Sequence, residues 1–127
     1  PITTLLCGGR HFMHIETSNV VKLQITDVPR HDPIHVYLED YADGQGRITI
    51  SEYGESWTAY WGAMGGSLSD FILKADNGYI IGYLDGVLKM RSQKYKFMDS
   101  RLNAVKEALR RLHVHTVEPQ SKSNPQS

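Results

Sequence analysis

The amino-acid sequence predicts a single α+β domain, in which a mostly antiparallel sheet of four to six strands packs against a long C-terminal helix and one short helix. Three observations support this prediction. Apolar and polar residues alternate through several segments between residues 21 and 61, which is typical of half-buried strands. Apolar residues near the C-terminal end recur at steps of three and four, which is typical of an amphipathic helix. The length of 127 residues, with 40% hydrophobic and 22% charged residues, suits one ordinary globular domain.

The chain is expected to divide into three parts. Residues 1–19 are predicted to form an N-terminal arm without a regular element, because they show no clear period and Gly8-Gly9 interrupts them; Met13 is an alternative candidate for the first residue. Residues 20–116 are expected to form the single α+β domain. Residues 117–127 are expected to be a disordered tail, because the segment EPQSKSNPQS has no large apolar residue to bury.

The first two strands are predicted over residues 21–26 and 34–39, where every second residue is apolar. Each would turn its apolar side chains toward the core and its polar ones toward solvent. The apolar set is Val21, Leu23, Ile25, Ile34, Val36 and Leu38.

The segment RITISEYGESWTAYW, residues 47–61, is predicted to be a hairpin folded about Gly54–Glu55, because glycine suits the first position of a type II′ turn. That turn would pair Ile50 with Ala59. One face of the hairpin is then apolar and comprises Ile48, Ile50, Trp57, Ala59 and Trp61, with Trp57 and Trp61 as buried anchors. Glu52 is the exception on this face and is expected to be exposed at the hairpin end.

A short helix and a further strand are expected next. Ser67 and Asp70 have the spacing of a capping box, so a helix is predicted over residues 68–75, ended by Asn77-Gly78. Residues 79–84, YIIGYL, are rich in residues that favour strands and are predicted to be a strand, with a brief return strand over residues 87–90.

The last predicted element is a helix that begins between residues 92 and 100 and ends near residue 112. Its apolar residues fall within one narrow stripe: Met98, Leu102, Val105, Leu109 and Leu112. We expect this stripe to pack on the protein's own sheet, because the spacing spans too few turns to indicate a coiled coil.

The formal net charge of zero conceals an uneven distribution of charge. Residues 1–88 carry five Lys/Arg and eleven Asp/Glu, whereas residues 89–113 carry eight and two. The basic helix is expected either to lie across the acidic sheet or to face an acidic partner such as nucleic acid.

No motif for catalysis or for a cofactor stands out, so the protein is predicted not to be an enzyme and to need no cofactor. The acidic residues Asp40, Asp43, Glu52 and Glu55 are interpreted as solvated loop residues, and Cys7 as an ordinary thiol. Six histidines fall in three pairs, but their contexts are an arm, a proline-broken loop and a helix end. No metal site is therefore predicted, and the histidines are expected at the surface: His11/His14, His31/His35 and His113/His115.

Four residues are the candidates for binding a partner. Tyr53 and Tyr60 lie on the polar face of the predicted hairpin, and tyrosine is enriched in protein interfaces. Arg110 and Arg111 lie on the basic helix and point away from its apolar stripe. Because the charges surround that helix, nucleic-acid binding is expected to be weak. A homodimer is left open.

Three segments resemble uncharacterised small proteins of lambdoid phages and enterobacterial prophages. They are HIETSNVVKLQITDVP, then VYLED with GQGRITISEYGESWTAYWGAMG, then FILKADNGYIIGYL, and together they cover roughly residues 13–84. The resemblance implies an accessory protein that acts in the bacterial cytoplasm and binds and modulates a host protein, either an enzyme or a defence system. The alternatives are a nucleic-acid-associated protein that uses the basic helix, and a small enzyme.

No run of ~18 apolar residues indicates a membrane span, so no membrane partner is expected.

Overall fold

The structure, a computed structural model, describes residues 2–7, 11–42 and 44–117. Its strands are β1 (Ile2–Cys7), β2 (His11–Glu16), β3 (Val21–Ile25), β4 (Ile34–Ala42), β5 (Gln45–Glu52) and β6 (Glu55–Trp61). Its helices are α1 (Leu68–Lys74), α2 (Asn77–Leu84) and α3 (Gln93–Val117). The strands precede all three helices along the chain, which confirms the α+β class.

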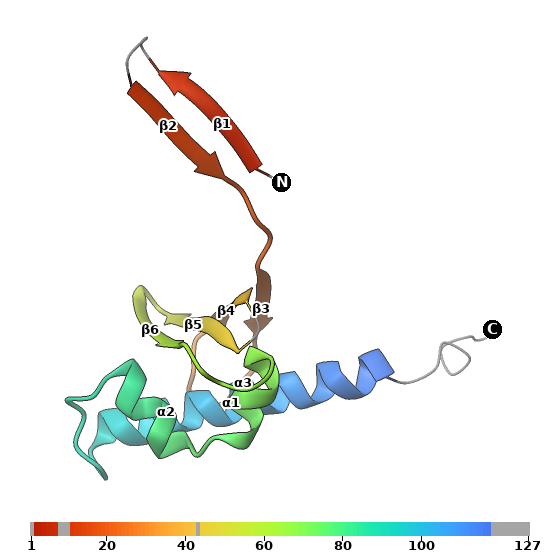
Figure 1. Cartoon of the computed structure of the whole chain (residues 1–127). Helices are drawn as coiled ribbons and strands as arrows, with labels where there is room; N and C mark the ends of the chain where they lie inside the picture. Colours follow the sequence, from red (N-terminus) through yellow and green to blue (C-terminus); the bar gives the residue numbers. More distant parts are fainter. Residues whose placement is uncertain (1, 8–10, 43, 118–127) are drawn as a thin grey trace.

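The body of the protein is a four-stranded antiparallel sheet with the strand order β3-β4-β5-β6. The three helices lie together on one face of this sheet (Figure 1). The core between the two layers contains the predicted strand residues Ile34, Val36, Ile48 and Ile50, all 0% exposed. Strictly alternating residues thus supply a continuous apolar face, as expected for a sheet covered on one side.

The N-terminal segment differs from its prediction, because it forms a hairpin. β1 and β2 pair in antiparallel fashion from Ile2↔Glu16 to Cys7↔His11. This hairpin projects away from the body (Figure 1). The prediction that these residues lack a regular element is therefore wrong. The tail was expected to begin at residue 117, but Val117 is the last residue of α3; residues 118–127 lie outside the described residues.

The hairpin of β5 and β6 is confirmed, but its turn and register are not those predicted. Glu52 pairs with Glu55 and Ile50 with Trp57, so the two turn residues are Tyr53 and Gly54. Their φ angles of 50° and 82° are both positive, as a type I′ turn requires. The true register differs from the predicted one by two residues. Since side chains alternate with a period of two, the assignment of faces survives this shift.

Helix α1 confirms the predicted short helix and its cap. The Ser67 side chain accepts a hydrogen bond of 3.2 Å from the backbone N–H of Asp70. The helix ends at Lys74, the C-cap residue Ala75 is extended, and Asn77 begins the next helix. Asn77-Gly78 therefore does not act as the predicted stop.

Residues 79–84 are part of helix α2, so the predicted strand is wrong. Ile80, Ile81 and Leu84 are buried while Tyr79 and Tyr83 are exposed, a spacing that follows the helical period. A strand would have turned the adjacent Ile80 and Ile81 to opposite faces, whereas the helix buries both. The expected return strand at residues 87–90 is a turn region that leads into α3.

Helix α3 confirms the long C-terminal helix but runs to Val117, beyond the predicted end near residue 112. Four residues of its apolar stripe are buried and Leu112 is 44% exposed. Two of its basic residues, Arg101 and Lys106, are also buried. None of the helices in the described part of the chain has both the length and the apolar character needed to cross a bilayer.

Candidate interaction surface

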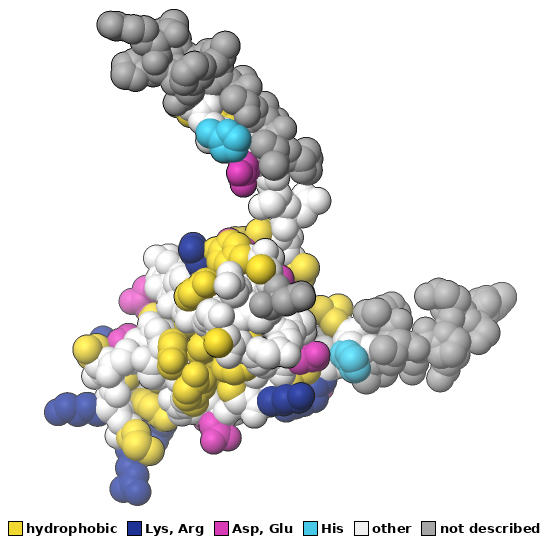
Figure 2. All heavy atoms as spheres, viewed as in Figure 1, with side chains coloured by type: hydrophobic (Ala, Val, Ile, Leu, Met, Phe, Trp, Pro, Cys, Tyr) yellow, Lys and Arg dark blue, Asp and Glu magenta, His cyan; other side chains and the backbone are white. Residues whose placement is uncertain are grey.

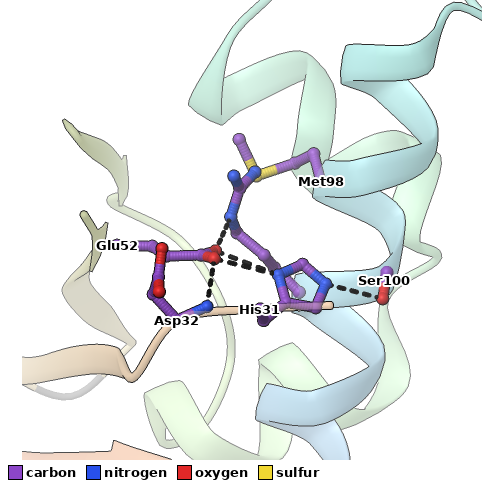
Figure 3. Close-up of polar contacts among 6 residues, drawn as sticks. His31, Asp32, Glu52, Met98 and Ser100 are labelled. Atoms are coloured by element: carbon purple, nitrogen blue, oxygen red, sulfur yellow. Dashed lines mark hydrogen bonds and ion pairs between the residues drawn. The ribbon is translucent and has the colours of Figure 1, made fainter. Parts of the chain in front are cut away.

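A buried polar cluster links the sheet to helix α3 at the end of β5. Glu52 lies on the inner face of the sheet and is 4% exposed. Its carboxylate accepts hydrogen bonds from His31 Nδ1 at 3.0 Å and from the backbone N–H of Asp32 at 2.9 Å. Arg101 of α3 donates from Nε to the same carboxylate (Figure 3). The prediction that Glu52 is a solvated loop residue is therefore wrong.

His31 completes this cluster from the turn between β3 and β4. Its Nε2 lies 2.9 Å from the Ser100 hydroxyl, and its ring stacks on Phe97 at a centroid distance of 4.3 Å. The His31 side chain is 1% exposed, so it is not the surface histidine that was expected. Both ring nitrogens are occupied by protein partners, which is typical of a structural histidine.

Arg101 is held by aromatic rings as well as by charge. Its guanidinium carbon lies 4.3 Å from the ring centroid of Trp57 and 4.7 Å from that of Phe97. Cation–π contacts of this kind strengthen when the cation is removed from water. Glu52 of β5 and Trp57 of β6 thus both contact Arg101 of α3, and these contacts tie α3 to the hairpin.

The cluster keeps Glu52 ionised. Burial alone would raise the pKa of the Glu52 carboxyl, but the hydrogen bonds from Arg101, His31 and Asp32 outweigh burial and hold that pKa below its ordinary value. A general base needs a pKa near the working pH and a free lone pair. Glu52 fits the role of a structural counter-ion better than that of a catalytic base.

A cleft of about 820 Å³ opens beside the cluster, between the hairpin tip and the start of α3. Its lining mixes both signs of charge with aromatic rings, and Arg101 and Glu52 form part of its wall. The other lining residues are Arg30, Asp32, Tyr53, Glu55, Ser56, Trp57, Asp85, Leu88, Lys94, Phe97 and Met98. The balanced charges favour no single class of small ionic ligand.

A group of exposed aromatic residues lies where α2 packs against β6. Tyr79 and Tyr83 are 46% and 50% exposed, and their ring centroids lie 5.0 Å apart. Both rings contact Trp61 of β6, which is 5% exposed, and Tyr79 also meets Phe71. Hydrophobic side chains gather over β6 and the short helices in the space-filling view (Figure 2). We call these four residues the tyrosine shelf.

The tyrosine shelf has the composition of a protein-binding surface. Tyrosine and tryptophan supply large contact areas with little loss of side-chain entropy, and they are enriched among the residues that dominate binding energy. Its side-chain hydrogen bond with Tyr79 raises the pKa of the Tyr83 hydroxyl, which therefore stays neutral at physiological pH. The buried Trp61 Nε1 has no hydrogen-bond partner among the described residues.

The four predicted partner-binding residues do not form one site. Tyr53 is 86% exposed at the tip of the hairpin, whereas Tyr60 lies near the other end of β6 on the outer face. Arg110 and Arg111, on the last turns of α3, form ion pairs with Glu107 at 3.1 Å and 3.0 Å. Of the four, Tyr60 is the one on the strand that carries Trp61 of the shelf.

The histidine pairs lie apart from one another. His31 is bound to Glu52, whereas His35 lies on β4 and faces the outer side of the sheet. His14 contacts Glu16 at 3.2 Å, and His113 is exposed on α3. Within the described residues, no group of three or more potential ligands could hold a metal ion. The side chains of His11 and His115 lie outside the described part.

Sequence reasoning missed both the polar cluster and the shelf, for different reasons. Glu52 and Arg101 are 49 residues apart, and no local pattern connects them. The shelf had a usable signal: Tyr79 and Tyr83 are four residues apart, and the same spacing relates Ile80 to Leu84. That pattern favours a helix with an aromatic face.

Comparison with known proteins identifies the family. Residues 13–113 match the model of a family whose description is simply Phage family. No curated protein and no solved structure matches the chain. The match covers most of β2, the whole four-stranded sheet, α1, α2 and most of α3. The phage origin implied by the sequence is confirmed, whereas its restriction to lambdoid phages and enterobacterial prophages stays a prediction. The chain belongs to this phage family.

Proposed function

We propose that this phage protein is a non-enzymatic accessory protein that binds and modulates a protein of the bacterial host, either an enzyme or a defence factor, in the host cytoplasm. One observation carries the proposal: two exposed tyrosines, Tyr79 and Tyr83, pack against the buried Trp61. A pair of exposed rings on a firmly packed base offers a partner apolar contact and two hydroxyls. The partner is expected to cover this tyrosine shelf.

The use made of the polar residues supports binding over catalysis. The Glu52 carboxylate and the two ring nitrogens of His31 are engaged in holding α3 to the sheet. A reaction would require these groups to release their partners. A small enzyme is therefore the less favoured alternative.

The nucleic-acid alternative draws on α3, which carries six of the 14 lysine and arginine residues. Of these, Arg101 and Lys106 are buried, Arg110 and Arg111 are paired with Glu107, and Lys94 and Lys96 are exposed near the other end of the helix. Phosphate binding needs several exposed cations on one face, because the release of counterions drives it. The helix suits this role poorly.

The proposal is tested by capturing host proteins on the purified protein and measuring the affinity of each purified candidate. A double substitution, Tyr79→Ser with Tyr83→Ser, is expected to weaken binding by about 100-fold, since two interface hot-spot rings are lost. Leu112→Ser is the matched control, because it removes an apolar residue of similar exposure from the far end of α3. A partner whose affinity is unchanged by the double substitution would contradict the proposal.

A further inference from the structure

The outer edge of β6 lies next to the tyrosine shelf and ends the sheet, since the strand order is β3-β4-β5-β6. In an antiparallel pair, alternate residues exchange hydrogen bonds with the neighbouring strand and the others point their backbone groups away. The two-residue turn makes Glu52 and Glu55 the closing hydrogen-bonded pair. By this parity, Ser56, Thr58 and Tyr60 point their N–H and C=O groups away from β5.

The side-chain geometry agrees with this parity. Thr49 and Thr58 face each other, and their hydroxyls lie 3.3 Å apart, as in a closely spaced pair that exchanges no backbone bonds. Ser56, Thr58 and Tyr60 are exposed, and among the described residues their backbone groups have no hydrogen-bond partner outside the sheet. Each of these three residues therefore has a backbone N–H and a C=O group available to a further strand.

The β6 edge lacks the features that usually protect an edge strand. Natural proteins block such edges with lysine, proline or a bulge. The sequence of β6, ESWTAYW, contains none of these residues, and its pairing with β5 is regular from Glu55 to Trp61. The opposite edge strand, β3, is shorter and carries Lys22. The two edges of the sheet are thus unequal, and β6 is the open one.

We propose that the partner protein supplies an extended segment that pairs with the edge of β6 as a fifth strand and lays alternate apolar side chains on Tyr79 and Tyr83. This inference rests on the proposed function and names its mode of binding. An extended main chain can pair with all three residues in a row, which a small molecule or a helix cannot do. The shelf lies on the inner side of that edge, because Trp61 is an inner-face residue.

The surroundings define the chemistry of this segment. Its inner face must be apolar to meet the shelf, and its outer face polar, because Ser56 and Thr58 lie there. Glu55 is the one charged residue of β6, and its side chain is exposed at the turn end of the strand. We therefore expect a strand that alternates apolar and polar residues and carries a lysine or arginine near the Glu55 end.

Thr58→Pro tests this inference directly. Proline removes the outward N–H of residue 58, which makes no bond within the sheet, and proline is tolerated on an edge strand. The fold should therefore persist, as judged by circular dichroism and thermal unfolding. Thr58→Val is the matched control, because it keeps the N–H and a β-branched side chain. The probe is a display library of short random peptides selected on the wild-type protein.

Selected peptides are expected to alternate apolar and polar residues. Their affinity should fall about tenfold or more in Thr58→Pro, because the hydrogen bond from the residue 58 N–H is lost and the proline ring obstructs pairing. Their affinity should stay nearly unchanged in Thr58→Val. Amide exchange of Thr58 and Tyr60 should slow when peptide binds. If peptides or a host partner bind Thr58→Pro as tightly as the wild type, strand addition is wrong.

The outcomes for the binding mode and for the proposed function are separable. A host partner lost on the double tyrosine substitution but retained by Thr58→Pro would support the shelf and refute the strand. Selection that enriches no alternating peptide would also refute strand addition. A wild-type dimer in light scattering that becomes a monomer in Thr58→Pro would assign the edge to a second copy of the chain and would overturn the choice of partner.

Discussion

Glu52→Gln is expected to destabilise the fold strongly, although it changes few atoms. The substitution removes the charge that faces Arg101, which is 7% exposed and has no other carboxylate partner among the described residues. Breaking a buried ion pair by removing one member typically costs about 3–5 kcal/mol, because the remaining charge stays buried without compensation. That cost is a large fraction of the stability of a domain of this size.

Urea unfolding gives the measurement. With a slope of about 2 kcal/mol per molar, the loss should lower the midpoint by about 2 M. Glu55→Gln is the matched control, because Glu55 lies directly opposite Glu52 on β6 but is exposed. Its midpoint should move little. Combining Glu52→Gln with Arg101→Met removes both charges and should recover much of the lost stability.

The pH dependence of the same pair supplies a second check. The pKa of Glu52 is lowered in the folded protein, so its stabilisation is complete above the ordinary value of 4.5 and is lost as the pH falls through the lower folded value. The gap in stability between the wild type and Glu52→Gln should be constant near neutral pH and shrink below about pH 4.5. A midpoint change as small as that of Glu55→Gln would show that the cluster is not a stabilising buried pair, and our reasoning would fail.

Four further predictions follow from the packing and the backbone. Trp61→Ala should cost about 3–5 kcal/mol, and an unchanged melting temperature would contradict its place in the core. Tyr53→Asn should raise stability by up to about 1 kcal/mol, because asparagine accepts the positive φ of 50° better than tyrosine; no gain in thermal unfolding would argue against the type I′ turn. Gly82→Ala should be more stable than Gly82→Val by about 0.5 kcal/mol, and the reverse order would indicate a strand. Wild-type protein should bind DNA or RNA only weakly at ~150 mM salt; submicromolar binding that is lost on Arg110→Glu with Arg111→Glu would reinstate the basic helix as the functional site.

Periodicity predicted those parts of the fold that depend on one face of one element. The alternation around Ile48 and Ile50 identified the buried face of the hairpin even though the turn was misplaced, because a shift of two residues leaves each side chain on its face. The capping serine Ser67 likewise depends on neighbours three residues away. Such features are local, so the sequence carries them directly.

Glu52 shows why the candidate site was harder to predict. The same alternation that assigned Ile50 to the core also assigned Glu52 to it, yet a carboxylate without a known partner is expected at the surface. Its partners lie in the β3–β4 turn and on α3, 21 and 49 residues away, and only the folded chain brings them together. In this chain, the polar residue in phase with the apolar face is the buried member of an ion pair.

The mistaken strand at residues 79–84 concealed the tyrosine shelf for a geometric reason. Residues four apart lie about 13 Å apart along an extended strand, so Tyr79 and Tyr83 would have been two separate side chains. In a helix the same residues rise only about 6 Å, and their rings meet at 5.0 Å. The helix therefore converts two scattered aromatics into one surface, and its packing beneath β6 sets that surface beside the open edge of the sheet. An alternating strand is the partner structure that can use both at once, because it offers backbone groups to the edge and side chains to the rings.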